Sequence, residues 1–261
     1  MHRKAFTMIE LIFVIIIMGI LAKFGTELFL KIYNGYTTTA WATSANEKTM
    51  NAIQDIANRL RERIPESVEV TGGGSGVRWI GRDVDGWNNG QWSGVADISP
   101  LTDSNNTQIE TPGTDGSYFS TANDYAVYFL QNDDIPGSAT FYTTNGSMHK
   151  VSGFDTSGTR NAFIFSNTLS RVSEFYVAAE YAYSLVFNSA SKTLTLSRWK
   201  PWNNGAVETF TLADGIDLFT VKNAQGNAGG FLVTLCQKTK MVFDQNNTIG
   251  EYRICKQKFI F

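Results

Sequence analysis

A long apolar run lies close to the N-terminal end of the chain. The run covers residues 5–22 and ends at Lys23. Its length is near the lower limit of about 17–25 apolar residues for a transmembrane helix. Arg3 and Lys4 precede the run, and no comparable basic cluster follows it. The positive-inside rule therefore predicts a cytoplasmic N-terminus, with everything after Lys23 on the other side of the membrane.

A second helical pattern follows over residues 50–64. Its apolar stripe consists of Met50, Ile53, Ile56, Ala57, Leu60 and Ile64, and Pro65 ends it. We predict one helix over residues 6–64, with residues 6–23 in the membrane. Residues 23–39 are rich in Gly and Thr, which are poor helix formers, so this part either stays helical or bends. At about 1.5 Å per residue the helix would be about 90 Å long, too long for one small domain to bury.

After Pro65 the pattern changes to short β-strands separated by turn residues. We predict an α+β fold, in which an antiparallel β domain over residues 65–261 packs on the second half of the helix. The predicted strands cover residues 125–131, 139–143, 162–165, 175–179, 181–187, 193–199, 208–212, 216–222, 231–243 and 249–261.

The last two predicted strands form a hairpin whose register can be tested. With residues 245–246 at the tip, Cys236 lies opposite Cys255 and Lys240 lies opposite Glu251. The same register gives the pair one apolar face, which a slip by one residue would scramble. Outside the cytoplasm this pairing predicts a disulfide; the alternative is two free thiols.

Composition limits the classes of function. The chain has 261 residues, of which 43% are hydrophobic and 18% charged, and its net charge is −2. This length fits one domain with a long extra element. Because no basic field is present, we expect no nucleic-acid partner.

Candidate catalytic and metal chemistry is sparse. His2 and His149 are the two histidines in the sequence, and we expect His149 to be a surface or turn residue. No catalytic pair or nucleotide loop is evident, so we expect no enzyme and no cofactor. Asp83, Asp85 and Asn88 alternate as in a calcium loop, but the bidentate glutamate of an EF-hand is missing. A plain polar turn is the alternative to this weak calcium candidate.

The string Trp-Asn-Asn-Gly occurs twice, beginning at Trp87 and at Trp202. Exposed tryptophans on such turns are suited to binding a sugar or a partner protein. The alternative is that they cap the core, and the sequence leaves both interpretations open.

The N-terminal motif points to a family. Residues 4–11, Lys-Ala-Phe-Thr-Met-Ile-Glu-Leu, followed by the apolar run, resemble the type IV prepilins, which include the pseudopilins of type II secretion. The resemblance implies that residues 1–5 are a leader, that a peptidase cuts between Ala5 and Phe6, and that Phe6 is N-methylated. Glu10 then occupies the fifth mature position, where the family has a glutamate. Ala5 is a departure, because the family usually has Gly there.

The charge of Glu10 explains why such a motif suits assembly. A lone carboxylate within an apolar helix costs at least about 2.5 kcal/mol and needs a partner. Cleavage creates an α-amino group on Phe6, which in a filament can pair with Glu10 of a neighbouring subunit. Alternatively Glu10 pairs with its own amine. An ordinary signal peptide needs no such charge, and no small-x-small cleavage site follows the run.

The resemblance implies a minor pseudopilin that assembles into a periplasmic filament of a type II secretion system. Residues 212–219 and 230–235 faintly resemble a J-type minor pseudopilin. The alternatives are a minor pilin of a type IV pilus or DNA-uptake filament, and a membrane-anchored periplasmic binding protein. The implied partners are other pilin subunits, the prepilin peptidase, the inner membrane and an assembly platform. The implied location is a single-pass inner-membrane protein with a periplasmic domain, placed in a filament or at the cell surface after assembly.

Overall fold

The computed structural model describes residues 7–99, 107–119, 125–130, 138–143, 146–156, 161–169, 172–203, 205–223, 230–242 and 249–261. The chain divides into two compact units. The first consists of Met1–Lys48 and Lys238–Ile254, and the second consists of Thr49–Gln237 and Cys255–Phe261.

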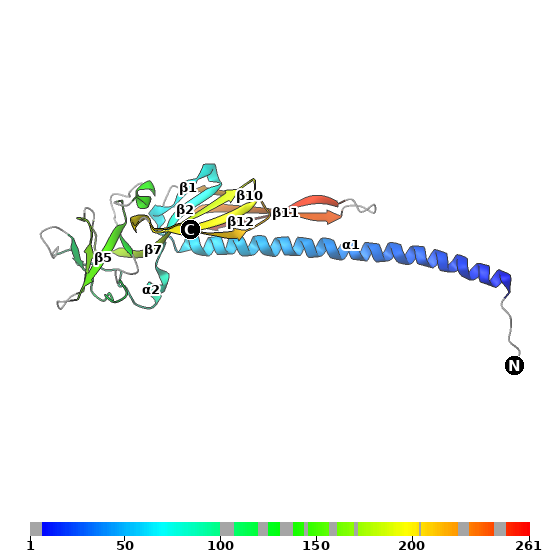
Figure 1. Ribbon diagram of the computed structural model, residues 1–261, viewed down its shortest axis with the longest axis horizontal. Coiled ribbons are helices and arrows are strands. Elements are labelled where there is room, and N and C mark those ends of the chain that lie inside the picture. Colours follow the sequence, from blue (N-terminus) through cyan, green and yellow to red (C-terminus); the bar gives the residue numbers. More distant parts are fainter. Residues whose placement is uncertain are drawn as a thin grey trace, which may run out of the picture. The chain divides into compact units, whose positions relative to one another are not determined.

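The helix α1 is continuous from Met8 to Arg61 (Figure 1). The Gly- and Thr-rich part over residues 23–39 stays helical, without a break. Its threonine hydroxyls donate to carbonyl oxygens of the preceding turn, from Thr26 to Ala22 at 3.0 Å and from Thr39 to Gly35 at 2.8 Å. These bonds satisfy the hydroxyls within the helix, so the residues are tolerated despite their low helix propensity.

The C-terminal end of α1 lies before the predicted end at Ile64. The helix stops at Arg61, and a 3-10 turn, η1, follows over Pro65–Ser67. Between them the chain pairs with strand β2, Gly76–Arg82: the backbone N–H of Ile64 donates to the carbonyl of Ile80 at 2.9 Å. Pairing with a strand requires extended backbone, so it ends the helix earlier than Pro65 alone would.

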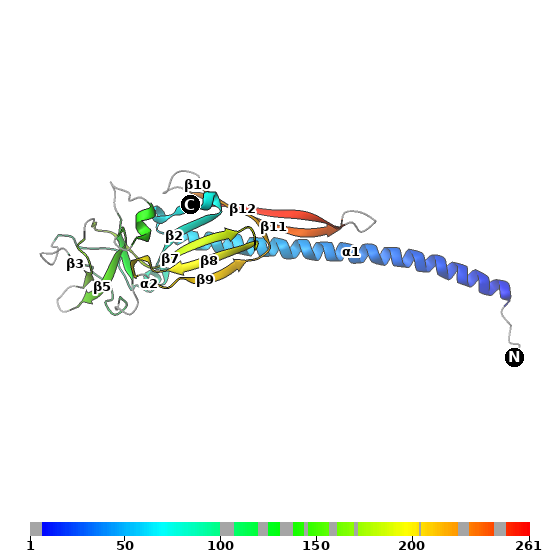
Figure 2. The same ribbon diagram turned by 45° about the horizontal axis from the view of Figure 1, so that its top comes forward.

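Most of the described strands belong to one antiparallel sheet. Its order is β1-β2-β7-β4-β5-β6-β3, while β8 pairs with β7 and β9 pairs with β8. Figure 2 shows β2, β7, β8 and β9 as successive neighbours. The remaining bounds are β1 Glu69–Thr71, β3 Gln108–Glu110, β4 Ala126–Phe129, β5 His149–Asp155, β6 Ala162–Phe165, β7 Tyr176–Asn188, β8 Thr193–Trp199 and β9 Glu208–Ala213.

Strand β7 is the central element of this sheet. The sequence suggested two strands separated at Glu180, but β7 runs through that residue without interruption. Strand β2 pairs along one edge of β7, whereas β4 pairs as far as Ala179 on the other edge and β8 takes over from Ala182. Glu180 therefore stays in the strand, and its carboxylate lies 3.9 Å from Lys200 Nζ.

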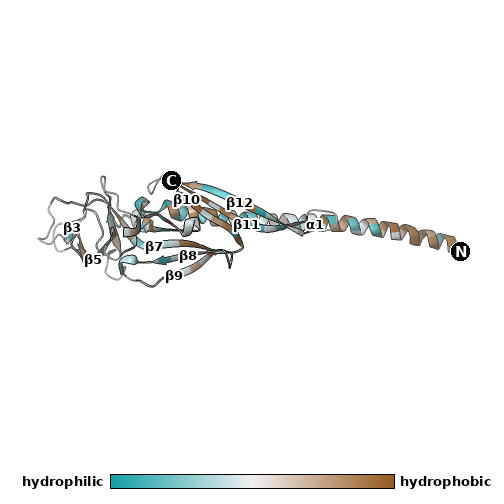
Figure 3. Ribbon diagram, turned by 90° about the horizontal axis from the view of Figure 1, so that it is seen from above, coloured by the Kyte–Doolittle hydropathy of each residue, from teal (hydrophilic) through white to brown (hydrophobic). Residues whose placement is uncertain are grey.

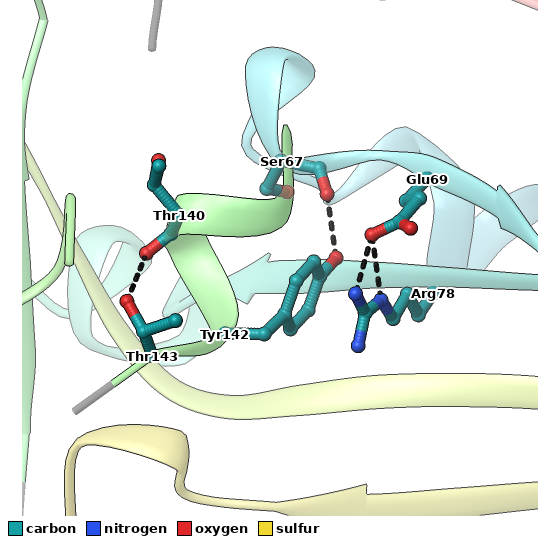
Figure 4. A network of polar contacts seen from close by, with 6 residues as sticks. All are labelled: Ser67, Glu69, Arg78, Thr140, Tyr142 and Thr143. Carbon is teal, nitrogen blue, oxygen red and sulfur yellow. Dashed lines mark hydrogen bonds and ion pairs between the residues drawn. The ribbon is translucent and has the colours of Figure 1, made fainter. Parts of the chain in front are cut away.

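The predicted strand over residues 139–143 is wrong, because the segment forms a 3-10 turn, η4, over Ser138–Tyr142. Figure 4 shows how side chains hold it. The hydroxyl of Tyr142 donates to the carbonyl of Ser67 at 2.5 Å, and the guanidinium of Arg78 lies 4.1 Å from the centre of the Tyr142 ring. Arg78 also binds Glu69 through two nitrogens, at 2.5 and 2.8 Å. Burial raises the pKa of Tyr142 well above its ordinary value.

Three further short helical elements lie beside the strands of the large sheet in sequence. The helix α2, Val84–Asn88, follows β2 directly and was not predicted as a helix. The 3-10 turn η2, Gly72–Gly74, connects β1 to β2, and η5, Pro201–Asn203, follows β8.

A smaller sheet has the order β10-β11-β12. Its strands are β10 Ile216–Asn223, β11 Phe231–Val242 and β12 Ile249–Ile260. The core between α1 and the sheets contains Ile53, Ile56, Ala57 and Leu60 of the predicted helix stripe, whereas Met50 is 47% exposed and Ile64 is buried in a separate cluster. The α+β prediction is thus confirmed. Prominent members of this core are Ile53, Ile56, Ala57, Leu60, Trp79, Leu185, Phe219, Phe231, Leu235 and Ile260.

Candidate functional site

The first turns of α1, from Met8 to Leu21, are exposed and apolar apart from Glu10 and Gly19. Twelve large apolar side chains between Met8 and Leu21 have exposed fractions of 43–85%. Figure 3 shows that hydrophobic residues, in brown, predominate towards the N-terminal end of α1. Burial stabilises each such side chain by about 1.5–3 kcal/mol, so leaving all twelve in water would cost tens of kcal/mol. A helix that is hydrophobic all round is stable only when lipid or other protein covers it.

By length and composition α1 is able to cross a membrane, and its most apolar stretch lies near the N-terminus and is 0% buried within the protein. A membrane anchor and a signal sequence both have this composition. A core helix of a water-soluble domain is excluded by the exposure of the stretch.

The exposed apolar surface continues beyond Lys23, the first basic residue of the helix. Between Lys23 and Trp41 the apolar residues concentrate on one face, while charged residues form a separate line. This part of the helix is therefore amphipathic, as expected for a helix that packs against protein outside the membrane interior. We call it the aromatic stripe; it consists of Phe24, Leu28, Phe29, Ile32, Tyr33 and Tyr36, all exposed. The line of charges consists of Lys23, Glu27 and Lys31.

Two glycines lie on the aromatic stripe. A Cβ at Gly25 or at Gly35 would meet nothing within 4 Å, so neither glycine is required by packing inside the described chain. Small residues on an exposed helix face allow a second helix to approach closely. Sequence reasoning considered these glycines only as weak helix formers. The apolar residues beside these glycines recur at a spacing of four, and this spacing is the signal in the sequence that indicates the stripe.

Glu10 lies in the first turn of α1, where its backbone N–H donates to the carbonyl of Thr7 at 3.1 Å. Its side chain is exposed, and one turn further along the helix follow the exposed Phe13 and Val14. A carboxylate in the first turn also interacts favourably with the helix dipole. Ala5 and Phe6 lie outside the described residues, so cleavage and methylation remain predictions.

The predicted disulfide is confirmed. Cys236 and Cys255 are bonded, with their Cα atoms 4.0 Å apart. Glu251 forms its ion pair with Lys238, at 2.6 Å, in place of the predicted Lys240. The predicted turn tip at residues 245–246 lies outside the described residues. Because the ion pair is exposed, the covalent bond contributes far more to holding the hairpin.

The residues of the weak calcium candidate have other roles in the structure. Asp83 is the N-cap of α2: its Oδ1 accepts from the backbone N–H of Gly86 at 3.0 Å. Its Oδ2 accepts from the hydroxyl of Tyr118 at 2.9 Å. Asp85 and Asn88 are part of α2 itself. Within the described part of the chain, no group of three or more His, Cys, Asp or Glu residues is placed to hold a metal ion.

The tryptophans of the two Trp-Asn-Asn-Gly strings differ in burial. Trp202 is 2% exposed and belongs to the core, whereas Trp87 on α2 is 49% exposed. His149 differs from the prediction, because its ring packs between Phe129 and Phe165 at centroid distances of 5.7 and 6.1 Å. Burial there lowers the pKa of His149 to about 4.

Comparison of the chain with family models, curated proteins and solved structures finds no match. The architecture itself is pilin-like: a long apolar N-terminal helix contacts C-terminal antiparallel sheets, with a disulfide near the C-terminal end.

Proposed function

We propose that the chain is a filament subunit of the pilin type, a minor pseudopilin that assembles through α1 in a secretion system of the inner membrane. The leader 1–5 is removed, Phe6 becomes the methylated N-terminus, and the first half of α1 spans the membrane before assembly. The domain after the helix then lies in the periplasm. The chain itself performs no catalysis, and its partners are other subunits, the prepilin peptidase and an assembly platform.

The observation that carries this proposal is the exposed aromatic stripe of α1. A simple anchor needs apolar residues only within the bilayer, and the run over residues 5–22 already supplies them. The stripe continues past Lys23 to Tyr36, and the same part of the helix carries a separate line of charges that a membrane interior disfavours. Helix packing between subunits explains both the apolar stretch and the amphipathic stretch, whereas anchoring explains only the first.

Glu10 gives the assembled helices their register in this proposal. Once desolvated, its carboxylate needs a cation, and the amine of Phe6 from a neighbouring subunit supplies one. Loss of an interaction worth about 2.5 kcal/mol raises the concentration needed for assembly more than tenfold.

Two measurements on the native protein test the proposal. Mass spectrometry of chains purified from membranes is expected to find N-methylated Phe6 as the first residue. Glu10→Ala should leave membrane insertion intact but abolish filaments seen by electron microscopy. Glu27→Ala, a change of an exposed carboxylate on the same helix, is the matched control and should assemble normally. A chain that keeps Met1 or begins after Ala22, or normal filaments from Glu10→Ala, would contradict the proposal.

A further inference from the structure

The second unit contains a surface cavity next to α2. Neither α1 nor the disulfide contributes a residue to its lining. Its volume is about 300 Å³, and it is partly open to solvent. We call it the Trp87 pocket (α2 is labelled in Figure 1). Its lining includes Arg82, Trp87, Trp92, Val95, Leu130 and Phe175.

The rim of the Trp87 pocket is apolar and exposed. Phe175 is 57% exposed, and Trp87, Val95 and Leu130 are also exposed large hydrophobic residues. Singly exposed apolar residues are ordinary, but four around one cavity form a contiguous patch. Aromatic residues at such patches are the anchors that protein–protein interfaces favour.

The floor of the pocket is rigid. Trp92 is buried, its ring lies 4.8 Å from that of Trp87, and its Nε1 donates to the carbonyl of Asp83 at 3.2 Å. Gly94 has φ +73°, and a Cβ there would lie 3.2 Å from the Trp87 ring. The cap made by Asp83 stabilises the start of α2, the helix that carries Trp87. The cavity is therefore preformed, which lowers the entropic cost of binding.

One charged residue, Arg82, is among the described residues that line the pocket. Three other arginines of this unit have carboxylate partners: Arg59 with Asp55, Arg78 with Glu69 and Arg198 with Glu208. Arg82 is exposed and has no such partner within the described part of the chain. A cation beside an apolar cavity is complementary to an apolar group that carries a neighbouring carboxylate.

We propose that the Trp87 pocket is a docking site for a partner protein, in which one aromatic or large aliphatic side chain fills the cavity and an adjacent Asp or Glu pairs with Arg82. The volume lies at the lower end of the range for ligand sites, about 300–1,000 Å³, and so suits a single anchoring side chain. A sugar site needs several converging polar groups, whereas this lining is mainly apolar. The proposal does not depend on filament assembly.

The test uses the full chain in lipid nanodiscs, panned against a phage library of random peptides. We expect enriched peptides to carry an aromatic, Leu or Met residue next to Asp or Glu. For the best peptide, Trp87→Ala and Phe175→Ser should each weaken binding about tenfold, the loss expected for an anchor contact. Arg82→Gln should weaken it and should remove the preference for the acidic peptide over its Gln analogue.

Two variants outside the pocket serve as controls. Phe210→Ser removes another exposed phenylalanine, on β9, and Arg61→Gln removes another exposed arginine; both should bind as the original chain does. The proposal would be overturned if no such peptides were enriched. It would also be overturned if Trp87→Ala, Phe175→Ser and Arg82→Gln bound the peptide as tightly as the original chain does. Saturable binding of glycans at the pocket in place of peptides would overturn it as well.

Discussion

Arg63 Nη1 donates a hydrogen bond to the main-chain oxygen of Phe261, with 3.0 Å between the two atoms. The same nitrogen donates to the carbonyl of Leu60 at 2.6 Å, and the guanidinium lies 5.3 Å from the centre of the Phe231 ring. Arg63 is buried, and this burial lowers the pKa of its guanidinium below the ordinary value. One side chain thus connects the end of α1 to the last described residue after β12.

Replacing Arg63 should therefore destabilise the second unit. Arg63→Met keeps the apolar stem but leaves the buried carbonyl of Leu60 and the main-chain oxygen of Phe261 without this donor, which should cost about 3 kcal/mol in the free energy of unfolding. Urea denaturation measures the change. Arg61→Met, at the exposed last residue of α1, should change stability by less than about 0.5 kcal/mol. Equal effects of the two substitutions would show that the buried contacts contribute little.

The Cys236–Cys255 disulfide should be a major source of stability for the C-terminal hairpin. The bond joins residues separated by 19 positions, a loop for which the chain-entropy model gives about 3 kcal/mol. The double variant Cys236→Ala/Cys255→Ala should lose about this amount in urea denaturation. The unsubstituted chain with reductant should behave in the same way. Two titratable thiols in the chain unfolded without reductant would contradict the bond.

The aromatic stripe should act in assembly and not in folding. Leu28→Gln with Ile32→Gln removes two exposed apolar side chains, so thermal unfolding of the monomer should hardly change. If each contributes about 1.5–3 kcal/mol when buried between subunits, the concentration needed for assembly should rise more than tenfold. Sedimentation of filaments measures it. The control Glu27→Gln with Lys31→Gln changes the neighbouring line of charges, and filaments should persist; filaments from the first variant would refute the role of the stripe.

The half-buried ring of His149 should make stability depend on pH. The folded pKa is lowered from 6.5 to about 4, so the unfolded chain takes up the proton first as the pH falls. Stability from this residue is complete above pH 6.5, declines between 6.5 and 4, and levels off below that. The loss should amount to about 3 kcal/mol.

His149→Phe provides the reference, because it keeps an aromatic ring between Phe129 and Phe165 without a titratable group. The difference in unfolding free energy between the two proteins, measured by urea denaturation across this pH range, isolates the histidine from the carboxylates. A difference that stays constant with pH would show that His149 is not held neutral.

The local pattern of the sequence was sufficient for several features of this fold. The apolar run, the part of the stripe from Ile53 to Leu60, and the pairing of Cys236 with Cys255 all follow from periodicities of neighbouring residues. Such periodicities describe which side chains share a face, and that depends only on helix and strand geometry. These predictions therefore held without knowledge of distant contacts.

Other features depend on segments far apart in the chain. Identical Trp-Asn-Asn-Gly strings place Trp202 in the core and Trp87 at the surface, because the first packs in a buried cluster of the large sheet and the second lies on the short helix α2. Residues 138–142 form a turn since Tyr142 is held by Ser67 and Arg78, which lie far away in sequence. Burial and hydrogen-bond partners of this kind arise only when the sheets assemble, and no local pattern encodes them.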